Sequence, residues 1–419
     1  MKKKYAIFTV TIFILLVTTF TYFNTLKQNN IYKENIENNQ TKITKGISMN
    51  LEQTAGAGDY KTVTQSGWPT EGYKFNTELS RCENGSELSW DDTKKAVIVS
   101  GNLSDKCYVY FDIWIPTIAD YCTSGTDLAT CVKNFGDQGV DVSNIYIHDS
   151  SLTNGAGDNS YRYAGANPNN FVCFGSDATT CPTDNLYRII GVIDNKVKLI
   201  KADFASSTLL GTNGDYGYSS SPASTYKGSL TQIEGYYWNK SSEQNTWSIS
   251  SLNKTNLNTN FINNIGTTWS NKIATTKWKV GEGDFSNFVP KIVYQNEIVN
   301  PQAGQYSTTG ETEYSAKIGL IYVSDYGFAT IPDAWTLTMY NYNNSTAINN
   351  NWLYLGVNEF TITPMTTAVD CVNSIGYDAK LMTGFVGMDS NGVRPVFNLE
   401  SSVTYVSGDG TQSSPIRIN

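Results

Sequence analysis

The hydrophobic pattern of the chain begins with an uncharged, mainly apolar run from Tyr5 to Leu26, which follows three lysines. A helix needs roughly 20 apolar residues to cross a membrane, and lysines at its start favour keeping that end in the cytoplasm. The run is longer than the hydrophobic region of a signal peptide and has no small-residue cleavage pattern. It predicts an uncleaved transmembrane anchor over 1–26, with a cleaved signal peptide as the alternative.

Beyond the anchor, the pattern becomes polar and then strand-like. Residues 27–58 are rich in Asn, Lys, Glu, Thr and Gly and predict a stalk. Two apolar, aromatic-rich runs separated by turn residues predict a small β domain over 59–116. A connector over 117–160 contains a helix, because four apolar residues recur at the spacing of one helix face. These residues are Leu128, Cys131, Val132 and Phe135.

Residues 161–419 form the predicted large domain, in which strand-like runs stand before and after a helical middle segment. This order is typical of an α+β domain and not of repeated βαβ units. The fold class expected for the whole chain is therefore α+β and β-rich, with an N-terminal transmembrane helix, a small β domain and a large mixed domain.

Six of the seven cysteines fall into local pairs, which are Cys82–Cys107, Cys122–Cys131 and Cys173–Cys181. In an exported chain this pattern predicts three disulfides. Zinc is the competing interpretation, but the chain has no Cys-x-x-Cys and a single histidine. We therefore expect no metal and no cofactor. Cys371 remains, and a buried thiol is favoured over a nucleophile.

The formal net charge of −8 argues against a nucleic-acid partner, which attracts basic surfaces. Only 16% of the residues are charged, yet aromatic residues are plentiful. This composition indicates a folded, β-rich protein with polar loops and not a disordered chain.

Seven segments, which occur in the same order along the chain as in the family, carry a family resemblance. They are 160–170 (SYRYAGANPNN), 185–191 (NLYRIIG), 196–202 (KVKLIKA), 318–327 (IGLIYVSDYG), 351–356 (NWLYLG), 392–399 (GVRPVFNL) and 407–411 (SGDGT). From about residue 145 to the end, the chain resembles a recurrent ectodomain of uncharacterised surface proteins of low-GC Gram-positive bacteria. That family implies no activity.

The Gly-x-Arg-Pro strand followed by a last hairpin is also similar to the C-type-lectin-like fold, which sulfatase-modifying enzymes share. This resemblance implies a large C-type-lectin-like domain, with a binding face formed by the long segment 365–389 before the last strands. Neither the sulfatase-modifying activity nor the calcium-dependent binding of the lectins is inferred for this chain. The modifying enzymes use a nearby pair of cysteines, whereas Cys371 stands alone, and the calcium-binding triplet of the lectins has no convincing match.

Candidate catalytic residues are few. His148, the single histidine, lies in the connector next to Asp149 and is expected to be a surface or turn residue. A glycosidase needs two positioned acids, but no spacing singles out a pair among the candidate carboxylates. These are Glu234, Glu282, Asp284, Asp325, Glu359 and Asp389. No catalytic residue is assigned.

Arg394 lies between Val393 and Pro395 in an apolar strand. A buried arginine needs an acidic or carbonyl partner, so we expect a structural pairing role, with Asp325 as a candidate partner.

Aromatic residues among Asn-rich loops are the better indication of a binding site, because Tyr and Trp beside amides suit glycan or protein recognition. The candidates are Trp335, Tyr340, Tyr342, Trp352 and Tyr354, together with Tyr377 and Asp389 from the segment 365–389. Core packing is the alternative for all five aromatics, and it is favoured for Trp352 and Tyr354.

The sequence therefore predicts a single-pass cell-membrane protein with a cytoplasmic N-terminus and an extracellular binding or adhesion domain. Its ligand would be a glycan, a protein or a cell-wall component. An extracellular carboxylate-dependent hydrolase is the first alternative. A pilin-like structural subunit is the second, although the processing site of pilins is missing after the lysines.

Overall fold

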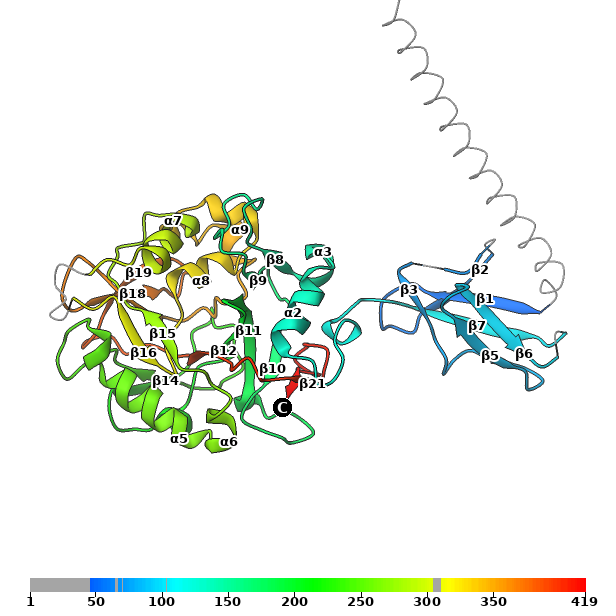
Figure 1. The fold of residues 1–419 in the computed structure, drawn as a ribbon, viewed down its shortest axis with the longest axis horizontal. Helices are drawn as coiled ribbons and strands as arrows, with labels where there is room; N and C mark the ends of the chain where they lie inside the picture. Colours follow the sequence, from blue (N-terminus) through cyan, green and yellow to red (C-terminus); the bar gives the residue numbers. More distant parts are fainter. Residues whose placement is uncertain (1–45, 65–66, 70, 103, 304–309) are drawn as a thin grey trace, which may run out of the picture. The chain divides into compact units, whose positions relative to one another are not determined.

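The computed structural model describes residues 46–64, 67–69, 71–102, 104–303 and 310–419 (Figure 1). The predicted anchor and most of the predicted stalk lie outside these residues.

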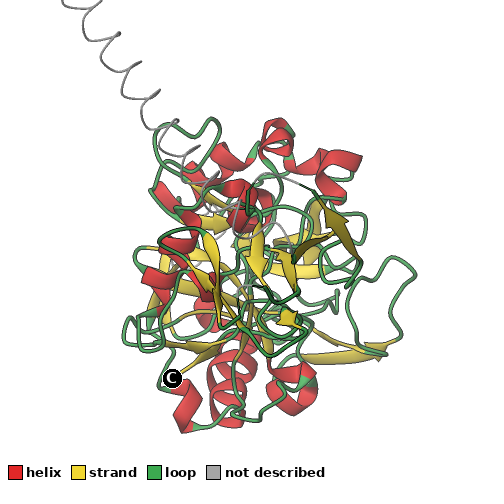
Figure 2. Ribbon diagram, turned by 90° about the vertical axis from the view of Figure 1, so that its right-hand side faces the viewer, coloured by secondary structure: helices red, strands yellow, loops and turns green. Residues whose placement is uncertain are grey.

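The described chain is β-rich, with short helices (Figure 2). No helix in the described ranges is long and apolar enough to cross a membrane. The α+β class expected for the chain is therefore wrong, because the described residues are β-rich with few helices. The predicted transmembrane helix lies outside these residues, and the C-type-lectin-like domain stays a prediction. The helical middle segment is nevertheless present as one continuous stretch, in which η4 (Leu252–Phe261) runs directly into α5 (Ile262–Asn264) and ends before Gly266.

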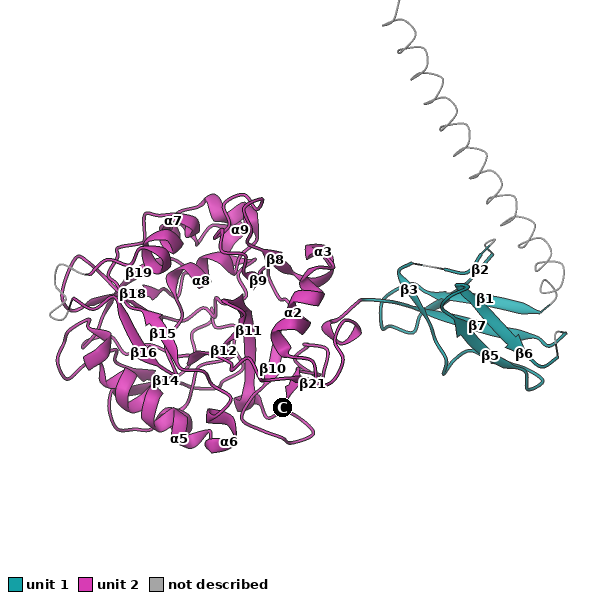
Figure 3. Ribbon diagram, viewed as in Figure 1, with its two compact units in different colours: residues 1–115 teal, residues 116–419 magenta. Residues whose placement is uncertain are grey.

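The chain divides into two compact units, Met1–Ile115 and Pro116–Asn419 (Figure 3). The first unit has a sheet of order β2-β1-β7-β3, in which β4 also pairs with β7, and a separate β5–β6 hairpin. The strands are β1 (Ile47–Glu52), β2 (Tyr60–Val63), β3 (Tyr73–Phe75), β4 (Arg81–Cys82), β5 (Glu87–Asp91), β6 (Ala96–Ser100) and β7 (Cys107–Ile113).

Strand β7 forms the centre of the first unit because its residues alternate between the core and the surface. Cys107, Val109 and Phe111 are buried and their neighbours are partly exposed, which is the period of a strand with one buried face. Strand β1 pairs with β7 in parallel. The last part of the predicted stalk therefore belongs to this sheet.

The second unit is organised around a six-stranded sheet of order β20-β12-β11-β9-β8, in which β10 also pairs with β11. Its strands are β8 (Ile145–Ile147), β9 (Tyr161–Tyr163), β10 (Phe171–Cys173), β11 (Leu186–Ile193), β12 (Lys196–Lys201) and β20 (Val396–Asn398). Strand β11 is buried along nearly its whole length, as its continuous apolar run requires.

Smaller sheets surround this central sheet. They are β13 (Tyr216–Ser220) with β14 (Ile233–Tyr236), β15 (Thr276–Lys279) with β16 (Glu313–Ala316), β21 (Tyr405–Ser407) with β22 (Arg417–Ile418), and a sheet of β17 (Glu359–Pro364), β18 (Cys371–Ile375) and β19 (Leu381–Phe385).

Helices α5 and α6 lie at one end of the unit and α7 and α9 at the other (Figure 1), whereas every residue of α8 is buried. The α-helices are α2 (Leu128–Gly136), α3 (Val140–Ser143), α4 (Ser207–Leu210), α5 (Ile262–Asn264), α6 (Thr267–Ser270), α7 (Pro290–Tyr294), α8 (Val323–Phe328) and α9 (Ser345–Ile348). The π-helices are η4 (Leu252–Phe261) and η5 (Gln295–Val299). The 3-10 helices are η1 (Ile118–Asp120), η2 (Thr183–Asn185), η3 (Trp247–Ile249), η6 (Pro332–Thr336) and η7 (Met339–Asn341).

Helix α2 begins after Asp127, whose side chain accepts a hydrogen bond from the amide of Thr130 at 2.9 Å. Its apolar face, including Leu128 and Val132, packs into the same core as Ile189 of the central sheet. The segment predicted as a connector is therefore part of the second unit.

Candidate functional site

The three cysteine pairs predicted from their local spacing are disulfides in the structure: Cys82–Cys107, Cys122–Cys131 and Cys173–Cys181. Cys371 is a buried free thiol. Burial raises its pKa to about 11, so little reactive thiolate is present at neutral pH. Among the described residues, no cluster of three or more His, Cys, Asp or Glu side chains could hold a metal ion.

Four of the aromatic residues predicted to contact a ligand are buried: Trp335, Tyr342, Trp352 and Tyr354. Their polar atoms donate to backbone carbonyl oxygens inside the protein. Trp335 Nε1 lies 3.0 Å from the oxygen of Thr330, and Tyr342 Oη lies 2.9 Å from that of Gly327. Trp352 and Tyr354 donate in the same way to Tyr163 and Tyr377. These four residues support the core, and their assignment as ligand contacts is corrected.

The other three candidates reach the surface. Tyr340 is exposed in η7, where the ammonium group of Lys380 lies 5.2 Å from its ring centre. Tyr377 is 59% exposed, and Asp389 is partly exposed. The structure brings Tyr377 and Asp389 together in one groove, while Tyr340 lies outside its lining.

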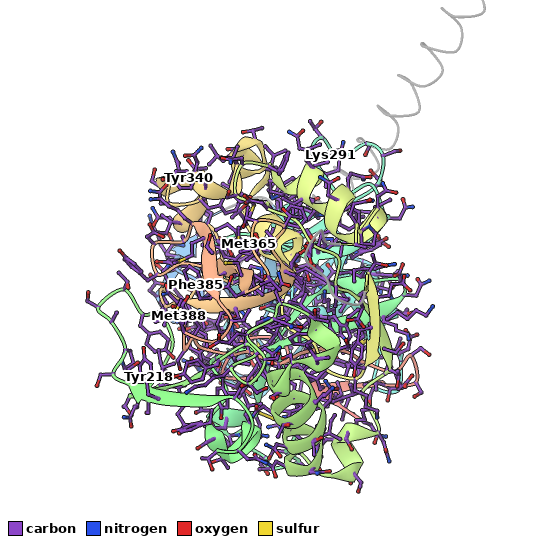
Figure 4. The ribbon with its side chains drawn as sticks, turned by 90° about the vertical axis from the view of Figure 1, so that its left-hand side faces the viewer. Tyr218, Lys291, Tyr340, Met365, Phe385 and Met388 are labelled. Atoms are coloured by element: carbon purple, nitrogen blue, oxygen red, sulfur yellow. A yellow bond between two sulfur atoms is a disulfide. The ribbon has the colours of Figure 1, made fainter. Side chains whose placement is uncertain are left out.

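This groove, which we call the hairpin groove, has a volume of about 360 Å³. One wall is the β13–β14 hairpin with Tyr218, and another is formed by the segments 356–358 and 388–392. Tyr377 completes the lining. Tyr218, in the middle of β13, is 58% exposed, and Figure 4 shows it at the outer edge of the unit, with Met388 beside it in this view.

Close contact with Ser390 holds the hairpin against the rest of the groove. A Cβ atom on Gly217 would lie 2.0 Å from the Ser390 hydroxyl oxygen, and one on Gly235 would lie 2.1 Å from it. Both distances are far below van der Waals contact, so only glycine fits at these two positions. The two glycines therefore allow Ser390 to lie directly against the hairpin.

Asn391 is the most deeply placed polar side chain of the lining, with 8% of its surface exposed. Its backbone is satisfied, because its amide donates to Tyr236 and its carbonyl accepts from Tyr236, at 3.1 and 2.9 Å. Its side-chain amide forms no hydrogen bond with the described residues. Its polar atoms are not among the buried side-chain atoms that lack a partner, so they reach the open groove and are available to a ligand.

Further neutral polar groups lie around Asn391. Asn358 Oδ1 accepts a hydrogen bond from the amide of Tyr377 at 2.7 Å, which leaves the amino group of Asn358 available. Asp389 is the single charged side chain among the described lining residues, and its Oδ2 accepts from the amide of Phe385 at 2.7 Å. The groove therefore offers aromatic faces, amides and hydroxyls, with little net charge.

Arg394, two residues after Gly392 of the groove lining, has a structural pairing role, but its partner is Glu359 and not Asp325. Its Nε and Nη2 donate to the two carboxylate oxygens of Glu359 at 2.8 and 2.6 Å. Asp325 instead pairs with Arg162 at 2.8 Å and with Lys198 in the core.

The remaining catalytic candidates do not converge on the groove. Of the six candidate acids, Asp389 is the one that belongs to the described lining. Glu234, for example, accepts a hydrogen bond from the Ser207 hydroxyl at 3.0 Å. His148 is fully buried and not a surface residue, and burial lowers its pKa to about 3. Its Nδ1 accepts from the amide of Ala156 at 3.0 Å.

Sequence reasoning missed Tyr218 and Asn391. The alternation Tyr216-Gly-Tyr218 before two serines could have indicated an exposed strand. Asn391 gave no such signal, because its place in the groove depends on contacts with residues more than 150 positions away. No family model, no curated protein and no solved structure matches this chain.

Proposed function

We propose that this chain is an extracellular recognition protein whose second unit binds its ligand noncovalently in the hairpin groove. The observation that carries the proposal is the side-chain amide of Asn391, which has no hydrogen-bond partner among the described residues and lines a groove that also exposes Tyr218 and Tyr377. Ligand sites commonly combine apolar surface with a few well-placed polar groups. Three disulfides support an oxidising compartment outside the cytoplasm.

Binding is favoured over hydrolysis because of the number of acids in the groove. Glycoside hydrolysis uses two carboxyl groups on either side of the scissile bond. The described lining contains a single one, Asp389. His148 cannot replace the second acid, since it is buried outside the groove.

The proposal is tested with the purified full chain on an array of immobilised glycans, extracellular proteins and cell-wall fragments. The groove variant combines Tyr218→Ala and Tyr377→Ala, and Tyr340→Ala is the matched control, because all three tyrosines are more than half exposed. We expect the wild type and the control to bind the same spots and the groove variant to lose them. Equal binding by all three proteins, no binding to any spot, or turnover of a bound glycan would each overturn the proposal.

A further inference from the structure

A row of exposed apolar side chains continues from the groove across the surface of the second unit. Tyr218 and Met388 belong to the groove lining, and Phe385 lies three residues before Met388, at the end of β19. Their exposed fractions are 58, 67 and 37%. Figure 4 shows all three on one face, with Met388 between Tyr218 and Phe385.

The charge of the groove selects among ligands that aromatic surfaces could bind. A phosphate, sulfate or carboxylate group needs a cation or a set of aligned amides to replace its water. No Lys, Arg or His occurs among the described lining residues, and Asp389 would repel an anion. The groove is therefore suited to an uncharged ligand.

The polar groups specify what kind of uncharged ligand fits. A pyranose ring presents an apolar C–H face, which packs on Tyr or Trp, and a rim of hydroxyl groups that both donate and accept hydrogen bonds. The groove offers the matching set, with Tyr377 as an aromatic face and the amides of Asn358 and Asn391 as bifunctional partners. An apolar peptide side chain would cover the amide of Asn391 without giving it a hydrogen-bond partner.

The size of the groove limits how much of the ligand it holds. A volume of about 360 Å³ is near the lower end of the roughly 300–1,000 Å³ of ligand pockets. A chain of sugar units would therefore extend out of it. The exposed side chains of Met388 and Phe385 provide a surface on which the units outside the groove can lie.

We infer that the hairpin groove binds one or two units of a neutral, chain-like glycan through Asn391 and Tyr377, and that the following units lie along Met388 and Phe385. The inference rests on the proposed function and specifies the ligand class and the direction of the chain.

The test is calorimetry of the full chain with linear oligosaccharides of increasing length, built from glucose, mannose, galactose or N-acetylglucosamine. Sulfated and uronic-acid counterparts provide the charged comparison. We expect at least one neutral series to bind, with an affinity that rises with length. Phe385→Ala should weaken binding of the long members about three- to tenfold and leave the shortest binding member unchanged. Tyr340→Ala should have no effect at any length.

Asn391→Ala should weaken every length, by roughly two- to tenfold. Because Asn391 is buried, Tyr218→Ala serves as a second groove variant at an exposed position. Binding of a peptide or a charged glycan that the groove variants abolish would overturn the inference and leave the proposed function standing. Neutral glycan binding that no groove variant changes would overturn both.

Discussion

Arg394 and Glu359 form a bidentate ion pair between two segments that also contribute residues to the hairpin groove. Arg394 Nε and Nη2 donate to the two carboxylate oxygens at 2.8 and 2.6 Å, and Nη2 also donates to the carbonyl oxygen of Leu353 at 2.7 Å. Asn358 of the lining precedes Glu359 in the chain, and the Gly392 amide donates to the Asn358 carbonyl at 3.0 Å. The pair therefore fixes the two segments that form one wall of the groove.

Replacing Glu359 by Gln is the first prediction. The change leaves the Arg394 cation buried without a counter-charge, so we expect a loss of about 3–5 kcal/mol in the free energy of unfolding. Urea denaturation measures this loss. In the double variant Glu359→Leu with Arg394→Met, no buried charge remains, and we expect a smaller loss. A double variant that is less stable than Glu359→Gln would contradict this account.

The local features of the site could be predicted from the sequence, but its long-range contacts could not. Cysteine pairs 8, 9 and 25 residues apart are local, and their pairing followed from spacing. That Arg394 needs an acidic or carbonyl partner also followed, because a buried guanidinium requires one. Which acid lies beside it depends on the packing of β17 against the segment before β20, and several carboxylates were equally compatible with the pattern.

The aromatic residues show the same limit. Tyr340 and Tyr342 lie two residues apart in one Asn-rich segment, yet Tyr342 donates its hydroxyl to Gly327 inside the protein, whereas Tyr340 is mostly exposed. Either environment suits an aromatic ring with a polar end. Whether such a ring is buried or exposed depends on tertiary contacts with segments far away in the sequence. The local sequence pattern does not indicate these contacts.

The second prediction concerns Gly217. In Gly217→Ala the new methyl group meets the hydroxyl of Ser390, so the hairpin must move and the groove changes shape. We expect weaker binding of the groove ligand with little loss of fold, since β13 lies at the surface. Adding Ser390→Gly removes the clashing side chain and should restore most of the affinity. If the double variant binds no better than Gly217→Ala alone, contact with Ser390 does not set the position of the hairpin.

The disulfide between Cys82 and Cys107 is the basis of the third prediction. It joins directly opposite residues of β4 and β7 in a unit whose core consists of few buried side chains. Replacing both cysteines by Ala should therefore lower the stability of the first unit by about 2–5 kcal/mol. Hydrogen exchange followed by mass spectrometry should show faster exchange in peptides from β1 and β7. The matched removal of Cys173–Cys181 should leave those peptides unchanged, and equal exchange in all proteins would refute the prediction.

The fourth prediction follows from the burial of His148 against Phe328 and Trp335. Burial, helped by the nearby cation of Arg162, lowers the pKa of His148 from its ordinary value of 6.5 to about 3. As the pH falls below 6.5, the unfolded chain binds a proton that the folded protein excludes. His148 therefore contributes stability that is fully present above about pH 6.5 and is lost progressively toward pH 3.

The size of this effect can be measured where most carboxylates have not begun to titrate. Between about pH 7 and about pH 5, His148 should account for a loss of about 2 kcal/mol in the free energy of unfolding, at roughly 1.4 kcal/mol per pH unit below 6.5. In His148→Asn the side-chain amide oxygen can still accept the hydrogen bond from Ala156, but the side chain does not titrate. The free energy of unfolding, measured by urea denaturation, should therefore fall less steeply with pH than in the wild type. This holds even if the variant is less stable at every pH. Parallel declines in the two proteins would show that His148 remains accessible to protons in the folded state.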